Sequence, residues 1–136
     1  MTAVLLDTCA VLYMANGEPM APAAQAAMLA ARTAGGLLVS PVSAWEIGLL
    51  AKSGRVDFLP DAKTWFDAMR RGSGAVTAPF TAEIAIDSSF LPQPLHGDPA
   101  DRLLIATARH INLPLVTRDR LIRAYADAGH VQVIAC

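Results

Sequence analysis

The hydrophobic residues of the chain form short runs that are separated by longer segments of helical character. Four of these runs have the length of buried strands and contain few polar residues; they cover positions 4–6, 37–39, 115–117 and 131–134. A fifth short strand is predicted around Val76, before Pro79. Short apolar strands that alternate with helices are typical of a parallel sheet buried on both faces. We therefore predict an α/β fold with a central parallel sheet flanked by helices on both faces.

Turn residues and helix-capping residues set the expected bounds of the helices between these strands. Ser43 and Glu46 have the spacing of a capping box, Gly54 marks a helix end, and Asp98 with Pro99 marks a helix start. The helices predicted in this way cover positions 10–15, 23–34, 42–53, 62–71, 81–90, 99–111 and 119–125.

Length and composition favour one globular domain that spans residues 1–136. Just over half of the residues, 54%, are hydrophobic and only 17% are charged, which argues against disorder. The formal net charge is −1, whereas domains that bind nucleic acids are often strongly basic. Any contact with RNA would therefore have to depend on local arginines.

Cysteine content and hydropathy bear on the cellular compartment. Cys9 and Cys136 form neither a disulfide framework nor a metal-binding cluster, which favours a reduced, cytoplasmic protein. The apolar N-terminus lacks a positive segment and is interrupted by Asp7, so it does not fit a signal peptide. No stretch approaches the ~20 unbroken apolar residues of a membrane span, so we expect no membrane association.

Four carboxylates occupy positions that a parallel sheet brings toward one edge. Asp7 and Asp119 follow predicted strands, while Glu46 and Asp101 lie in the first turns of predicted helices. Two carboxylates about 5 Å apart repel by roughly 3 kcal/mol at an effective dielectric constant near 20, and a divalent cation relieves that repulsion. A site of oxygen ligands without a Cys or His pair favours Mg²⁺ or Mn²⁺ over Zn²⁺. Such an ion can activate water for attack on a phosphate.

Each of these acids also has a purely structural interpretation. Asp101 could complement a helix dipole, Glu46 could belong to the capping box, and Asp119 could cap the helix that follows it. For Asp98 the N-cap interpretation is favoured over metal binding. For Asp7 the structural interpretation is weakest, because a carboxylate that ends a buried strand is costly without a partner.

Four sequence motifs contain these acids: LLDT at positions 5–8, SAWEI at 43–47 followed by KSGRV at 52–56, HGDPADRLLIA at 96–106, and LVTRD at 115–119. In their order and spacing, these motifs resemble those of the PIN-domain ribonucleases, and most of all the VapC toxins of bacterial toxin–antitoxin pairs. The resemblance implies metal-dependent hydrolysis of RNA with Mg²⁺ or Mn²⁺. It also implies that the catalytic acids are Asp7, Glu46, Asp101 and Asp119.

The resemblance further implies roles for individual residues. Asp7 and Asp101 would be the direct metal ligands, and Glu46 and Asp119 would complete the site, partly through water. The auxiliary residues would be Asp98 at the rim, Thr117 through its hydroxyl, and Arg102, which could steady a carboxylate or phosphate or form a plain surface salt bridge. Cys9 stands where relatives often carry His or Asn, a departure that leaves the four acids intact.

The implied partners are a VapB-type antitoxin, an RNA substrate such as tRNA or rRNA, and a second copy of the chain in a homodimer. Trp45, Leu49 and Leu50 are candidates for the apolar wall of an antitoxin groove, although ordinary core packing is the favoured interpretation of these three residues. The alternative function is a non-catalytic PIN-like module that binds a partner or RNA. The presence of all four acids counts against that alternative.

Overall fold

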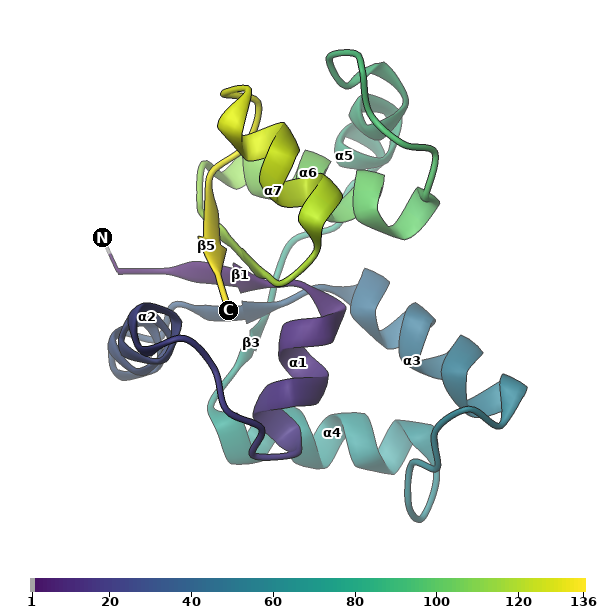
Figure 1. Cartoon of the computed structure of the whole chain (residues 1–136). Coiled ribbons are helices and arrows are strands. Elements are labelled where there is room, and N and C mark those ends of the chain that lie inside the picture. Colours follow the sequence, from purple (N-terminus) through teal and green to yellow (C-terminus); the bar gives the residue numbers. More distant parts are fainter. Residues whose placement is uncertain (1) are drawn as a thin grey trace.

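A computed structural model of the chain describes residues 2–136 and contains a five-stranded sheet (Figure 1). The strands are β1 (Val4–Leu6), β2 (Leu37–Val39), β3 (Val76–Thr77), β4 (Leu115–Thr117) and β5 (Val133–Ala135). Their order in the sheet is β3-β2-β1-β4-β5, and all neighbours are parallel. The predicted parallel sheet is therefore confirmed, with β5 beginning two residues later than predicted.

Within residues 2–136, seven helices connect these strands, and all seven were predicted within a few residues. They are α1 (Thr8–Ala15), α2 (Pro22–Thr33), α3 (Pro41–Ser53), α4 (Ala62–Ser73), α5 (Ala82–Asp87), α6 (Pro99–Ile111) and α7 (Arg120–Asp127). The segment predicted as one helix from 81 to 90 consists of α5 and the 3₁₀ turn η1 (Ser88–Phe90). Gly54 and Asn112, which follow α3 and α6, both adopt the left-handed conformation that ends helices. None of the helices in the described part of the chain is long and apolar enough to cross a membrane.

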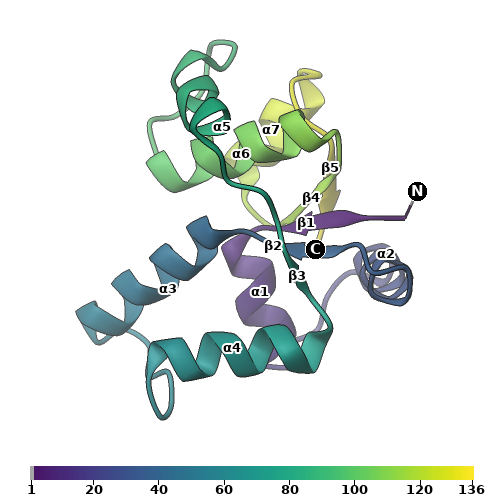
Figure 2. The same cartoon turned by 180° about the vertical axis from the view of Figure 1, so that it is seen from behind.

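Helices cover both faces of the sheet, because alternate residues of each strand point to opposite sides. Val4 and Leu6 of β1 pack into one core with residues of α1 to α4, whereas Leu5 packs into a second core with residues of α5, α6 and α7. Figures 1 and 2 show these two groups of helices on opposite sides of the strands. The predicted arrangement of a sheet between two helical layers is confirmed.

The strand order reverses at β1, and this reversal defines the place where a site can form. The chain adds β2 and β3 on one side of β1 and then returns to add β4 and β5 on the other side. In open α/β sheets, ligands bind outside the carboxyl ends of the strands at such a switch point. Asp7 directly follows β1 and Asp119 follows β4 by two residues, so both predicted acids lie at this edge.

The start of α3 differs from the prediction. Ser40, rather than Ser43, is the N-cap, and its hydroxyl accepts a hydrogen bond from the amide of Val42 at 3.0 Å. Pro41 occupies the first helical position, where its fixed φ favours helix initiation, so the helix begins earlier than expected. The predicted capping box of Ser43 with Glu46 is therefore wrong, and Glu46 is free for another role.

Candidate active site

Asp7 lies at the centre of the switch point and is almost completely buried, with 5% of its surface exposed. As the N-cap of α1, its Oδ1 accepts from the amide of Thr8 at 2.7 Å. Its Oδ2 accepts from the hydroxyl of Thr117 at 2.5 Å and from the thiol of Cys9 at 3.3 Å. Burial raises the pKa of Asp7, and these hydrogen bonds only partly oppose the rise. Its carboxyl group is therefore held by neutral donors, with no basic side chain in a salt bridge to it among residues 2–136.

Thr117 connects Asp7 with Asp119. Its hydroxyl donates to Asp7 and accepts from the amide of Asp119 at 3.0 Å. Asp119 is the N-cap of α7, and its Oδ1 accepts from the amides of Leu121 and Ile122, both at 2.9 Å. The capping interpretation of Asp119 is therefore confirmed, but it uses only one of the two carboxylate oxygens.

Glu46 enters the site from α3. The hydroxyl of Thr8 donates to Oε1 of Glu46 and also lies 2.8 Å from the hydroxyl of Ser43, which is fully buried. Partial burial raises the pKa of Glu46, and the negative charges of Asp7 and Asp101 add to the rise. Contacts between α1 and α3 therefore fix the position of this acid.

Asp101 enters the site from the first turn of α6. Asp98 caps this helix by accepting from the amide of Asp101 at 3.0 Å, so the favoured N-cap interpretation of Asp98 is confirmed. The Oδ2 of Asp101 lies 2.8 Å from Nε2 of His96. Burial, with smaller contributions from the charges of Asp98, Asp7 and Asp119, raises the pKa of Asp101 to about 6.

The charges of the four acids act on one another, although no hydrogen bond joins any two of them within residues 2–136, and we infer that they border one shared space. Asp7, Glu46 and Asp101 each have a raised pKa, and for each of them the negative charge of at least one neighbouring acid contributes to the rise. Three of the acids use only one carboxylate oxygen for hydrogen bonds within residues 2–136. The oxygens that accept none in this range are Oε2 of Glu46, Oδ1 of Asp101 and Oδ2 of Asp119. No fully buried side-chain oxygen in this range lacks a partner, so these three free oxygens are open to solvent. The site is therefore a set of anchored carboxylates with free oxygens available to a cation.

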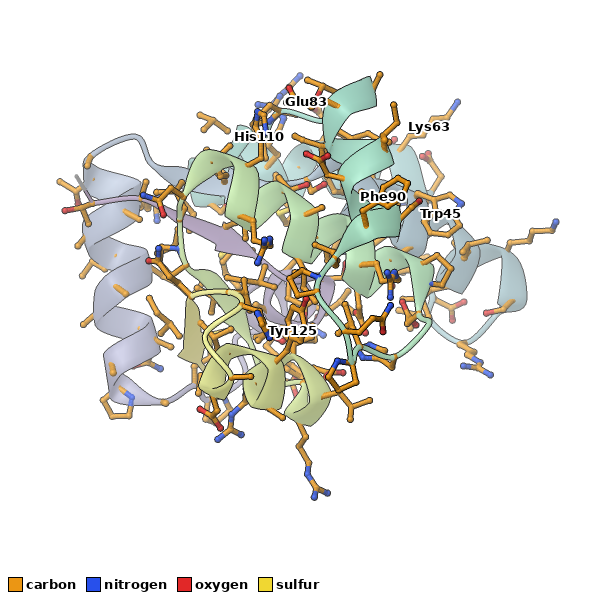
Figure 3. All side chains as sticks on the ribbon, turned by 90° about the horizontal axis from the view of Figure 1, so that it is seen from above. Trp45, Lys63, Glu83, Phe90, His110 and Tyr125 are labelled. Atoms are coloured by element: carbon orange, nitrogen blue, oxygen red, sulfur yellow. The ribbon has the colours of Figure 1, made fainter. Side chains whose placement is uncertain are left out.

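A different group of side chains forms the tightest potential metal site of the described residues. Ligand atoms of Glu83, Asp87 and His110 lie within 4.8 Å of one another, whereas no three of the four acids come this close. All three residues are exposed and belong to α5 and α6, where Figure 3 shows Glu83 and His110 together. This exposed group is distinct from the acids at the switch point and provides a matched set of carboxylates for control experiments.

A model of the PIN domain matches residues 4–128 of the chain. The chain belongs to the PIN-domain family. Ribonuclease VapC22 from Mycobacterium tuberculosis (strain ATCC 25618 / H37Rv) is 34% identical over 133 residues, which cover 98% of this chain and 99% of that protein. This identity over nearly the whole length places the chain in the VapC group of PIN domains.

Solved structures of low sequence identity share the fold. The structure of VapBC2 from Rickettsia felis, bound to a DNA fragment from the promoter of VapBC2, has a TM-score of 0.67 at 14% identity. The match covers 98% of both chains. FitAB bound to the IR36 DNA fragment has a TM-score of 0.58 at 18% identity, with coverage of 97% of this chain and 94% of that one. FitAcB from Neisseria gonorrhoeae has a TM-score of 0.54 at 18% identity, with coverage of 96% of both chains.

Arg102, which was expected to be an auxiliary residue of the active site, donates its hydrogen bonds to backbone carbonyls. Its Nε donates to the carbonyl oxygen of Ser88 at 3.1 Å, and its Nη1 donates to that of His96 at 3.3 Å. Arg102 is thus directed toward η1 and the loop before α6. In this conformation it stabilises the loop that carries His96.

Three polar residues that contact the acids or hold their partners were not assigned a role in the active site from the sequence. Thr8 and Ser43 position Glu46, and His96 contacts Asp101. The available signals were a hydroxyl directly after the strand-end acid and a histidine two residues before the N-cap of α6. Neither signal indicates a partner, because the partners of Thr8 lie 35 and 38 residues away.

The apolar residues of α3 depart from the favoured core interpretation. Trp45 is 50% exposed and Leu49 is 48% exposed, whereas Leu50 is partly buried against the core. The core interpretation is therefore wrong for Trp45 and Leu49, because the neighbouring positions Val42 and Ile47 supply the buried contacts of this helix. Trp45 and Leu49 remain available for contact with a partner.

Proposed function

We propose that this PIN-domain chain, acting as one unit over residues 1–136, is a metal-dependent endoribonuclease and the toxin of a VapBC-type toxin–antitoxin pair. The observation that carries the proposal is the set of anchored carboxylates at the switch point, three of which have an oxygen open to solvent. The 34% identity to Ribonuclease VapC22 over nearly the whole chain supports cleavage of RNA as the reaction.

The residues of the site fit a hard divalent cation, and Mg²⁺ is the proposed ion, with Mn²⁺ as a substitute. Asp7 and Asp101 would hold the ion directly, while Glu46 and Asp119 would act partly through water. The donors are carboxylate oxygens, which Mg²⁺ prefers, and burial together with the charges of neighbouring acids raises the pKa values of three of these acids. A bound cation would favour their ionised forms. The thiol of Cys9 donates to Oδ2 of Asp7 at 3.3 Å, and burial raises its pKa to about 12.

The carboxylates would divide the chemistry between them. A bound divalent ion would offset the charge on the scissile phosphate and make water more acidic. Oε2 of Glu46 accepts no hydrogen bond within residues 2–136, and burial raises the pKa of this acid, which suits Glu46 to accept a proton from the attacking water. The hydrogen bonds of Thr8 and Thr117 hold Glu46 and Asp7 in place during this step.

The decisive experiment incubates the purified protein with a total RNA pool in Mg²⁺, Mn²⁺ or EDTA. We expect cleavage with either ion and none with EDTA. Asp7→Asn should lower the rate by about 10³-fold or more, because several kcal/mol of charge stabilisation in the transition state depend on the metal site. The matched control is Asp87→Asn, which alters the exposed group on α5 and α6 and should leave the rate unchanged.

Two results would contradict this proposal. Full activity of a folded Asp7→Asn variant would show that the switch-point acids are not catalytic, and loss of activity in Asp87→Asn would move the metal to the exposed group. RNA that binds but stays intact in every metal would favour the non-catalytic binding module. Sequencing of RNA 5′ ends after induction in cells would identify the substrate, for which tRNA and rRNA are the candidates.

The proposal includes a VapB-type antitoxin, a homodimer and a cytoplasmic location. The similar structures are those of VapBC2 and FitAB, which supports a partner of the antitoxin type. Trp45 and Leu49 are exposed on α3, the helix that carries Glu46, so they could form the apolar wall along which an antitoxin peptide reaches the acids. Leu49→Arg should weaken co-purification with the product of a neighbouring small reading frame. Light scattering of the toxin alone would test the homodimer.

A further inference from the structure

His96 contacts the proposed catalytic acid Asp101, and neither the resemblance nor the comparisons supply a role for it. It lies in the loop between η1 and α6, two residues before the N-cap Asp98. Its Nε2 is 2.8 Å from Oδ2 of Asp101, and the two side chains are only 21% and 18% exposed. This is a hydrogen bond in a largely desolvated environment, where its geometry is well defined.

The loop and the helix hold each other at this point. Arg102, the residue after Asp101, donates from Nη1 to the backbone carbonyl of His96 and from Nε to that of Ser88. The ring of His96 also lines a hollow of about 410 Å³, together with Leu121 and Tyr125 of α7. The backbone of His96 is therefore anchored to α6 next to the acid that its side chain contacts.

The free oxygen of Asp101 depends on this contact. Within residues 2–136, the only hydrogen bond to the Asp101 carboxylate is the one from His96, and it is made to Oδ2. The charges of Asp98, Asp7 and Asp119 all act unfavourably on the ionised Asp101. Without His96, this repulsion would favour rotamers that turn the carboxylate away from the other acids.

We propose that His96 is a positioning residue, whose Nε2–H holds Oδ2 of Asp101 so that Oδ1 faces the space shared by the four acids. The inference rests on the proposed function, because that space is where the divalent ion and the scissile phosphate would bind. Nε2 carries a proton in one neutral tautomer and in the imidazolium form, so the same contact forms in both. Hydrogen-bonded partners of metal ligands typically change metal affinity by about 10- to 100-fold when they are removed.

The test compares three variants of the full-length protein. His96→Ala removes the donor, His96→Gln replaces it with an amide N–H of similar reach, and His130→Ala removes another ring from the same hollow. We expect the Mn²⁺ dissociation constant, measured by electron paramagnetic resonance of free Mn²⁺, to rise about 10- to 100-fold in His96→Ala. His96→Gln should return to within about 3-fold of the wild type, and His130→Ala should match the wild type. In RNA cleavage, kcat should fall in His96→Ala while KM stays within about 3-fold.

A second measurement separates this inference from the proposed function. In the metal-free protein, the ¹³C resonance of the Asp101 carboxyl group should shift in His96→Ala and return toward its original position in His96→Gln. That result needs neither metal nor RNA, so it would support positioning even if the protein proved to cleave no RNA. Equal losses in His96→Ala and His96→Gln, or an unchanged Asp101 resonance in His96→Ala, would overturn the inference. Loss of Mn²⁺ binding in His130→Ala would show that a change in the hollow, and not loss of the hydrogen bond from His96, weakens metal binding.

Discussion

Replacing Asp101 with asparagine should stabilise the metal-free protein at neutral pH. Burial and neighbouring charges raise the pKa of Asp101 from 3.8 to about 6, so the folded protein disfavours its ionised form. A difference of about 2 pKa units corresponds to roughly 3 kcal/mol of lost folding free energy once the group is ionised. Asparagine resembles the neutral carboxyl group and can still accept the hydrogen bond from His96. For a domain of this size, roughly 3 kcal/mol corresponds to a rise in Tm of about 10 °C.

The pH dependence follows from the direction of the pKa shift. A carboxyl group whose pKa is raised by folding binds its proton more tightly in the folded state, so its contribution to stability is complete below the unfolded value of 3.8. That contribution is lost as the pH rises from about 4 to about 6. Burial raises the pKa values of Asp7 and Glu46 in the same direction, so the wild type should lose stability over this window by more than Asp101 alone accounts for.

Urea unfolding in EDTA, followed by circular dichroism at pH 4.5 and pH 7.5, measures the effect. Asp101→Asn should exceed the wild type by up to about 3 kcal/mol at pH 7.5 and by much less at pH 4.5. Asp57→Asn, which removes an exposed acid from the loop after α3, is the control and should show little difference at either pH. A variant that is less stable than the wild type at pH 7.5, or equally stabilised at both pH values, would refute the electrostatic reasoning. Added Mg²⁺ should raise the stability of the wild type and leave the variant nearly unchanged.

The remaining predictions concern the thiol, a close backbone approach and the α1–α3 contact. Burial raises the pKa of Cys9 to about 12, so its thiol should react with iodoacetamide at pH 8 about 10³-fold more slowly than a thiol of ordinary pKa. A reaction rate typical of free cysteine, measured by mass spectrometry, would contradict this prediction. Gly36→Ala should destabilise the protein by about 1–3 kcal/mol in urea unfolding, because its Cβ would lie 2.6 Å from the carbonyl oxygen of Thr2. Thr8→Val should cost about 1–3 kcal/mol and lower the cleavage rate through loss of the donor to Glu46, while Thr8→Ser should retain most of both.

The sequence was sufficient to predict the sheet and the helices because their signals are local. Each strand is a compact apolar run, and the helix boundaries carry residues with strong conformational preferences, such as Asp98 before Pro99 and Gly54 at a positive φ. The start of α3 was missed because two local signals competed there. Ser40 before Pro41 is the stronger start signal, since proline at the first helical position fixes φ, whereas the spacing of Ser43 and Glu46 alone fixes nothing.

The contacts that organise the site could not be predicted from the sequence because they depend on packing between distant elements. The hydroxyl of Thr8 reaches Glu46 only because α1 packs on α3, and His96 reaches Asp101 only because the preceding loop folds back on α6. The exposure of Trp45 has a similar cause. Apolar residues lie on several sides of α3, so their pattern does not reveal which side faces the core.

Capping a helix and binding a cation are compatible roles for the acids of this site. Asp119 uses Oδ1 for the amides of α7 and keeps Oδ2 free, and Asp7 binds the first amide of α1 from the end of β1. A carboxylate anchored in this way cannot rotate freely, and it lies at the sheet edge where α1, α6 and α7 all begin. The positive ends of these helix dipoles favour negative charge there by a few tenths of a kcal/mol to about 1 kcal/mol each. The dipole of α6, which acts on Asp101 in its first turn, therefore contributes less than the roughly 3 kcal/mol by which Asp101 is disfavoured as an anion. A bound cation can supply the remaining stabilisation.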